Sequence, residues 1–153
     1  MPADLTYYIR EGVLVGTIEG RMFHIEALSG GAGGSTRTSG TSAVNNPYME
    51  GLKTTGAATS RTHVHGGPLP PGKYTVRTPS HHPHLGLSAK LENPQIRPLG
   101  RDGFYIHSRG PHGSDGCIVP LDRLKFGDLM KALAKSHGGT LFVQETNDGT
   151  RYA

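Results

Sequence analysis

The sequence predicts a mainly β domain with one main helix, and three observations lead to this prediction. Gly (23) and Pro (11) make up about a fifth of the 153 residues, whereas charged residues make up only 18%. Helical bundles and coiled coils have the opposite bias, toward Ala, Leu, Glu and Lys. Short apolar, β-prone runs also recur between turn residues along the chain. The length is typical of one domain, so we expect residues 1–153 to form a single folded unit.

Three strands are expected near the N-terminus, at residues 5–10, 13–18 and 22–28. The turns between these runs fall at Glu11-Gly12 and Gly20-Arg21. The composition then changes, because residues 29–67 are dominated by Gly, Ser, Thr, Ala and Asn. Loops of this length are uncommon in compact domains and are usually functional or disordered. We therefore expect a long excursion across the surface before the fourth strand.

The second half of the chain is expected to contain five more strands and the helix. The strands are predicted at residues 73–78, 85–91, 104–107, 117–119 and 140–145, with a proline-rich break at residues 79–83. The helix is predicted over residues 121–136, where Asp122 can cap its start. Four apolar residues are expected near one face of this helix: Leu124, Leu129, Met130 and Leu133.

Composition and charge argue against several classes of function. The net charge is +4, but Lys and Arg are scattered and do not alternate with aromatic residues, so no nucleic-acid partner is expected. A single cysteine allows no internal disulfide and excludes a Cys-rich zinc site. No apolar run approaches the roughly 18 residues of a membrane span, so no membrane insertion is expected. The N-terminus lacks a basic region followed by an apolar stretch, so we expect a cytoplasmic protein unless another machine exports it.

The segment FYIHSRGPHGSDGCIVP, residues 104–120, carries the strongest signal for chemistry. Nine residues separate His107 from Cys117, and they include three Gly and one Pro. A short loop between two strands can bring their ends to neighbouring positions. A free cysteine is only a few per cent thiolate at neutral pH, and an adjacent imidazole can take its proton or pair with the thiolate. This arrangement predicts a cysteine nucleophile with a histidine base.

Residues beside the pair complete this hypothesis. Gly116 permits a tight turn before the cysteine, and the N–H groups of Asp115, Gly116 and Cys117 can converge into an oxyanion hole. Ser108 can orient the imidazole of His107 through its hydroxyl or its carbonyl. The alternative is that the cysteine is a small buried hydrophobic residue and the histidine is structural.

Four further residues near the pair are candidates for substrate binding: Ser114, Arg109, Tyr105 and His112. The guanidinium of Arg109 suits a free carboxylate on a peptide, although this side chain can equally be a solvated loop charge.

The segment resembles the active-site motif of the L,D-transpeptidase family, in which a His at a strand end and a loop precede Ser/Thr-His-Gly-Cys. The corresponding positions here are His107, Ser114, Asp115, Gly116 and Cys117. Asp115 stands where the family usually has His, so it either polarises the site or shapes the turn. The gap from His107 to Cys117 is shorter than in most members, and Val119-Pro120 replaces the common Arg.

These departures are similar to the pattern of the L,D-transpeptidase-like effectors of type VI secretion systems. This resemblance extends over about residues 5–143, and it includes Asn45-Asn-Pro47 and Gly67-Pro-Leu-Pro-Pro-Gly-Lys-Tyr-Thr75. It implies a β-barrel or sandwich that holds the Cys and His on adjacent strands, and a cofactor-free enzyme acting on peptidoglycan stems. The thiolate would attack the amide between meso-diaminopimelate and D-alanine, giving L,D-carboxypeptidase or exchange activity.

The resemblance also implies partners and a destination. Effectors of this group lack a signal peptide and are carried by type VI secretion components into the periplasm of target bacteria. A cognate immunity protein in the producing cell is then expected.

Two other functions remain open on the sequence alone. Five histidines suit a metal site that binds Zn, Cu or Ni: His63, His65, His81, His82 and His84. The sequence favours surface histidines over a metal site, because no carboxylate close in sequence completes such a site, and the histidines can also line the cleft. The remaining alternative is a binding module that keeps the fold without the chemistry.

Overall fold

The structure is a computed structural model that describes residues 2–29, 69, 71–94, 104–108 and 117–147. Within these residues the chain forms nine strands and one helix, which confirms the mainly β prediction. The elements in chain order are β1 (Ala3–Tyr8), β2 (Val13–Ile18), β3 (Arg21–Ser29), β4 (Gly72–Val76), β5 (Ser80–His82), β6 (Gly86–Glu92), β7 (Phe104–His107), β8 (Ile118–Pro120), α4 (Arg123–Ser136) and β9 (Gly139–Gln144).

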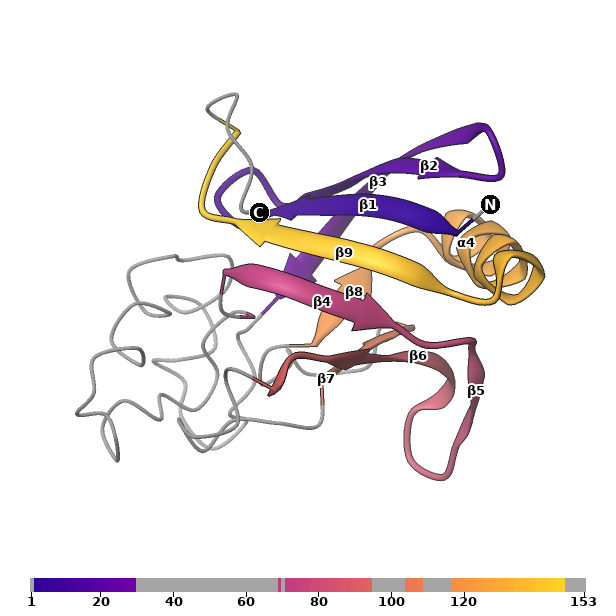
Figure 1. Ribbon diagram of the computed structural model, residues 1–153. Coiled ribbons are helices and arrows are strands. Elements are labelled where there is room, and N and C mark those ends of the chain that lie inside the picture. Colours follow the sequence, from indigo (N-terminus) through magenta and orange to yellow (C-terminus); the bar gives the residue numbers. More distant parts are fainter. Residues whose placement is uncertain (1, 30–68, 70, 95–103, 109–116, 148–153) are drawn as a thin grey trace.

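Eight of these strands close into a barrel (Figure 1). The strand order is β4-β9-β1-β2-β3-β8-β7-β6-β5, and an additional pairing between β4 and β6 closes the ring. Strand β5 lies outside the ring as an antiparallel partner of β6. The pairs β1–β9 and β7–β8 are parallel; β1 and β9 lie far apart in the chain, whereas β7 and β8 are consecutive strands.

The barrel is held together by inward-facing apolar side chains, which alternate with more exposed residues most clearly along β3, β4 and β7. Twelve of these core residues are Leu5, Tyr7, Leu14, Ile18, Ile25, Tyr74, Val76, Leu91, Ile106, Ile118, Leu141 and Val143. The parallel pairing of β9 with β1 requires Gly139, because a Cβ there would collide with the backbone of Ala3.

Helix α4 lies at the end of the barrel where β1 and β9 begin (Figure 1). The side chain of Asp122 caps its start by accepting hydrogen bonds from the N–H groups of Leu124 at 2.8 Å and Lys125 at 3.2 Å. The buried face consists of Phe126, Leu129, Met130, Leu133 and Ser136.

The prediction that Leu124 belongs to this face is wrong, because its side chain is 82% exposed. Phe126 takes its place, since residues 126, 129, 130 and 133 follow the helical spacing i, i+3, i+4 and i+7.

The structure differs from the sequence prediction most clearly at residues 79–83. The proline-rich break contains the short strand β5, which pairs with β6 and forms a hairpin with it. Strand β8 begins at Ile118, one residue after the predicted start. Of the predicted loop at residues 29–67, Ser29 instead ends β3, and its hydroxyl accepts a hydrogen bond from the Leu69 N–H at 2.9 Å. Residues 30–67 lie outside the described part of the chain.

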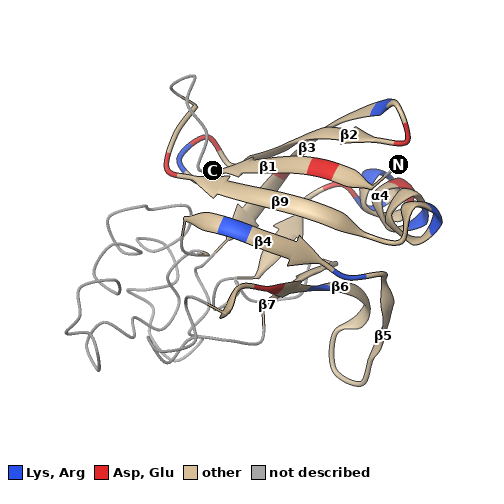
Figure 2. Ribbon diagram, in the orientation of Figure 1, with Lys and Arg blue, Asp and Glu red and all other residues tan. Residues whose placement is uncertain are grey.

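Charged residues are distributed over several elements in the described ranges (Figure 2). They lie on α4, in the turn between β2 and β3, and on β4 and β6. Within the same ranges, no helix has both the length and the apolar character needed to cross a membrane.

Candidate active site

The adjacent strands β7 and β8 position His107 and Cys117. The parallel pairing places Ile106 opposite Ile118, and both side chains are fully buried in the barrel. Successive side chains of a strand point to opposite faces, so Tyr105 and His107, on either side of the buried Ile106, face away from the barrel interior. Tyr105, His107 and Cys117 are all half-buried, and Cys117 directly precedes β8. The pairing therefore places Cys117, the residue before β8, beside Tyr105, which lies two residues before His107 on β7.

The sulfur of Cys117 lies beside the backbone of β7. The N–H of Tyr105 donates a hydrogen bond to the Cys117 Sγ, at a distance of 3.3 Å. A donor aimed at sulfur favours the negatively charged thiolate over the neutral thiol. Cys117 as a residue is half-buried and so is not part of the fully buried core.

The imidazole of His107 is oriented by the backbone of Ser108. The His107 Nδ1 lies 2.8 Å from the Ser108 carbonyl oxygen. A carbonyl oxygen only accepts, so Nδ1 carries the proton and donates it to this bond. In the neutral ring the unprotonated Nε2 is then the basic nitrogen. Of the two routes considered for Ser108, this contact uses the carbonyl and not the hydroxyl.

Burial keeps the His107 ring in its neutral form. Desolvation lowers the pKa of His107 below its usual value, and this is the largest effect. The hydrogen bond to the Ser108 carbonyl raises this pKa, and the nearby His82 lowers it. The net result is a neutral imidazole at pH 7, which is the form that a general base requires.

His82 is a further residue at this site, and sequence reasoning did not separate it from the neighbouring histidines. Its ring packs edge-on against the Tyr105 ring, with 5.0 Å between centroids. The His82 Nδ1 accepts the backbone N–H groups of His84 at 3.0 Å and Leu85 at 3.2 Å. These two donors hold the ring within the β5–β6 hairpin. A strand predicted at residues 80–82 would have placed His82 beside β6 and so would have singled it out. The prolines on both sides of this segment instead predicted a break in the chain.

The other predicted site residues are not part of the described structure. Arg109, His112, Ser114, Asp115 and Gly116 lie outside the described residues. The oxyanion hole and the binding roles of these residues stay predictions.

The described histidines do not gather into a metal site. Within the described ranges, no group of three or more His, Cys, Asp or Glu side chains could hold a metal ion. The rings of His82 and His84 are 5.9 Å apart, and His81 completes neither a triad nor a cluster with them. His63 and His65 lie outside the described residues.

Comparisons with known proteins find similarity at the level of the fold. No family model matches the sequence, and no match is found among curated proteins. The helical cell shape determining protein Pgp2 from Campylobacter jejuni superposes with a TM-score of 0.57 at 14% identity, over 99% of this chain and 49% of its own.

Two L,D-transpeptidases are similar as well. An L,D-transpeptidase from Mycobacterium tuberculosis H37Rv gives a TM-score of 0.51 at 15% identity, over 94% of this chain and 57% of its own. L,D-transpeptidase 3 from Mycobacterium tuberculosis, solved with a faropenem-derived adduct, gives 0.50 at 15% identity, over 94% of this chain and 60% of its own.

The chain therefore has an L,D-transpeptidase-like fold, as its sequence predicted. It spans between about half and three fifths of the length of these solved chains.

Proposed function

We propose that this chain is a cysteine enzyme that acts on the peptide stems of peptidoglycan, at the amide between meso-diaminopimelate and D-alanine. The observation that supports the proposal is the hydrogen bond from the Tyr105 N–H to the Cys117 Sγ at 3.3 Å, because Tyr105 lies on β7 two residues before His107. The L,D-transpeptidase-like fold and the Ser-x-Gly-Cys-Ile resemblance support the choice of substrate.

The proposed reaction starts from a neutral His107 imidazole and the Cys117 thiol. The His107 Nε2 takes the thiol proton, and the Cys117 sulfur attacks the carbonyl carbon of the scissile amide. A C–S bond forms, the C–N bond breaks, and the imidazolium returns its proton to the leaving amine of D-alanine. Water then hydrolyses the thioester in an L,D-carboxypeptidase, whereas an amine resolves it in exchange or cross-linking. In this proposal the backbone near Gly116 holds the oxyanion, and Asp115 shapes the turn.

The proposal extends to an antibacterial role. We propose delivery by type VI secretion components to the periplasm of a target bacterium, and a cognate immunity protein that protects the producer. The support for these partners is the sequence resemblance to the effector group.

The direct test is to incubate purified tetrapeptide muropeptides with the wild type and with Cys117→Ala, and to analyse the products by mass spectrometry. We expect tripeptide stems from the wild type and none from the variant, because the thioester cannot form without the sulfur. Circular dichroism and thermal unfolding verify that the variant is folded. Trimming by folded Cys117→Ala at the wild-type rate would exclude the cysteine mechanism.

A second variant in the same assay tests the base. His107→Ala should lower the rate by a factor on the order of 10²–10⁴, the usual contribution of general acid–base catalysis. A loss smaller than threefold would remove His107 from the mechanism.

A further inference from the structure

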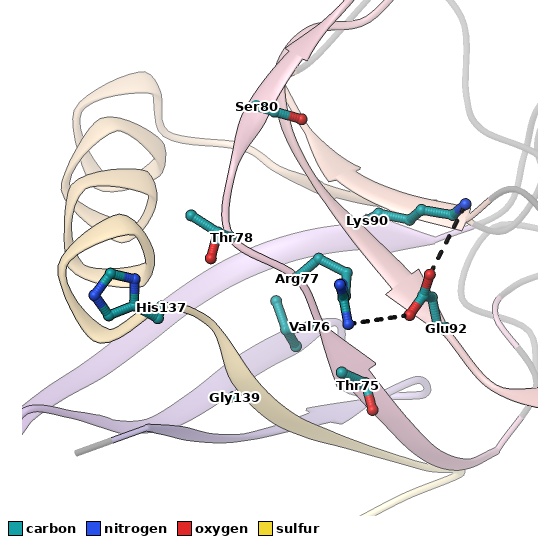
Figure 3. A pocket seen from close by; sticks show the side chains of 9 residues that line it. All are labelled: Thr75, Val76, Arg77, Thr78, Ser80, Lys90, Glu92, His137 and Gly139. Atoms are coloured by element: carbon teal, nitrogen blue, oxygen red, sulfur yellow. Dashed lines mark ion pairs between the residues drawn. The ribbon is translucent and has the colours of Figure 1, made fainter.

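A polar cavity of about 630 Å³ lies on the barrel surface between β4, β6 and the end of α4 (Figure 3). Its volume lies within the range of about 300–1,000 Å³ that is typical of small-molecule sites. Charged and hydroxyl side chains line it, including Thr75, Arg77, Ser80, Lys90 and Glu92. The proposed reaction assigns it no role.

The charges in the cavity are arranged as two cations around one carboxylate. The Arg77 Nη1 lies 3.7 Å from the Glu92 Oε1, and the Lys90 Nζ lies 4.0 Å from the Glu92 Oε2 (Figure 3). Both distances exceed those of charge-assisted hydrogen bonds, which are about 2.7–2.9 Å. The guanidinium and ammonium N–H groups can therefore donate to a second carboxylate, and Glu92 can accept from an ammonium group.

The backbone around the cavity is held in place by close contacts. The N–H of Arg77 donates to the Lys90 carbonyl oxygen at 2.9 Å, which fixes the start of the Arg77 side chain against β6. On the opposite side, the turn after α4 packs so tightly on β4 that a Cβ at Gly138 would collide with the Val76 carbonyl oxygen. The cavity is therefore shaped by backbone contacts on both sides.

The sheet connects this cavity to the candidate active site. Lys90 pairs with Tyr105, whose N–H contacts the Cys117 sulfur. Ser80 pairs with Ser88, which in turn pairs with His107. Neighbouring strands lie about 4.8 Å apart, so the cavity edge is about 10 Å from the catalytic pair. A long amino-acid side chain of a substrate bound at Cys117 can reach across this distance.

We propose that this cavity binds an α-amino-acid head group, with its carboxylate at Arg77 and Lys90 and its ammonium group at Glu92. The inference rests on the proposed function and adds a specificity site to it. Two substrates carry this chemistry: the free end of the diaminopimelate side chain on the donor stem, and a free amino acid that resolves the thioester.

The test compares two tetrapeptide stems that differ only at the third residue, with diaminopimelate in one and lysine in the other. Lysine keeps the side-chain ammonium but lacks the side-chain carboxylate. We expect Arg77→Gln to lower kcat/KM for the diaminopimelate stem on the order of tenfold, mainly through KM, because a charge-assisted hydrogen bond is lost. The wild type should prefer the diaminopimelate stem over the lysine stem, and Arg77→Gln should lose this preference.

Arg21→Gln is the matched control. Arg21 is also an exposed arginine in an ion pair, with Asp128 at 3.3 Å, and its side-chain exposure of 60% is close to the 62% of Arg77. Arg21 lies on β3 next to α4, so Arg21→Gln should leave both stems at their wild-type rates.

A third arm of the test adds a free D-amino acid. A selective loss of exchange in Arg77→Gln would identify the acceptor as the source of the head group. Unchanged rates for Arg77→Gln in every arm, in an active enzyme, would overturn the proposal.

A binding measurement keeps this proposal separate from the catalytic one. Free meso-diaminopimelate is titrated into Cys117→Ala and followed by the amide signals of Arg77 and Lys90 in NMR spectra. Saturable shifts that disappear in Cys117→Ala/Arg77→Gln support the cavity even if no stem is cleaved. Absence of saturable shifts would contradict it even if the enzyme trims stems.

Discussion

The two sides of the barrel differ in how their strands are built. Strands β1, β2, β3 and β9 have six, six, nine and six residues, and they pair along nearly their whole lengths. Strands β5, β7 and β8 have only three, four and three residues, yet they carry or border the proposed site. The long strands provide the stable frame of the barrel, and the short strands provide the positions where chemistry can occur.

The short strands are useful because they end early. A longer β8 would place a carbonyl opposite the Tyr105 N–H, and this donor would then belong to the sheet. Since β8 begins only at Ile118, the Tyr105 N–H donates to the Cys117 sulfur instead. Likewise, His107 ends β7, and its ring bonds to the carbonyl of the next residue. Backbone groups at the ends of these strands, where pairing between strands stops, thus supply the polar contacts of the site.

The comparison predicts that the same substitution has very different effects on the two sides. Leu5→Ala on β1 should lower the free energy of unfolding by about 2–5 kcal/mol, because a fully buried leucine leaves a cavity. Leu87→Ala in the β5–β6 hairpin is the control, since that side chain is 47% exposed and its loss should cost less than about 0.5 kcal/mol. Urea unfolding measures both values. Equal losses would show that the two sides share the stability evenly.

On the side of the barrel that carries the candidate site, kcat/KM should depend on pH through His107. Because the pKa of His107 is lowered, its ring stays neutral to a lower pH than an ordinary histidine does. The acid limb of kcat/KM should therefore fall below pH ~6.5, the ordinary histidine value. His82→Asn should move this limb to higher pH, because the charge of His82 lowers the pKa of His107. Movement to lower pH would contradict the assigned effect of His82 on the pKa of His107.

The smallest effect is expected at Ser108. Since the His107 ring bonds to the Ser108 carbonyl, Ser108→Ala keeps this contact and should change kcat by less than threefold. Steady-state kinetics on tetrapeptide stems measures the change. A loss of a hundredfold would mean that the hydroxyl, and not the carbonyl, orients the base.

Local patterns in the sequence identified the elements that depend on local interactions. The strands β2 and β7 were predicted with their observed bounds, and Asp122 caps α4 as expected. The pairings that close the barrel were not predicted. The parallel pair β1–β9 and the closing pair β4–β6 depend on side chains that meet only in the folded chain.

The candidate site was predictable to a similar degree. The short, glycine-rich spacing between His107 and Cys117 predicted neighbouring strands, and β7 and β8 do pair, whereas contact between the two side chains stays a prediction. His82 was not singled out, because β5 lies within a proline-rich segment that predicts no strand. The His82 ring also meets the Tyr105 ring only after β5 and β6 have formed their hairpin. The cavity at Arg77 has no sequence signal either, since its charges come from β6 and from the residue after β4, and its far wall comes from the turn after α4.

The most direct test of the central claim is the alkylation rate of Cys117, the protein's only cysteine, in the wild type and in His107→Gln. Iodoacetamide reacts with the thiolate, and mass spectrometry of the intact protein follows a single addition. The account predicts that the wild type reacts about tenfold faster at pH 7, and that the two rates converge above pH ~9.5, where the thiol ionises without help. Equal rates at pH 7 would show that the imidazole does not activate the sulfur.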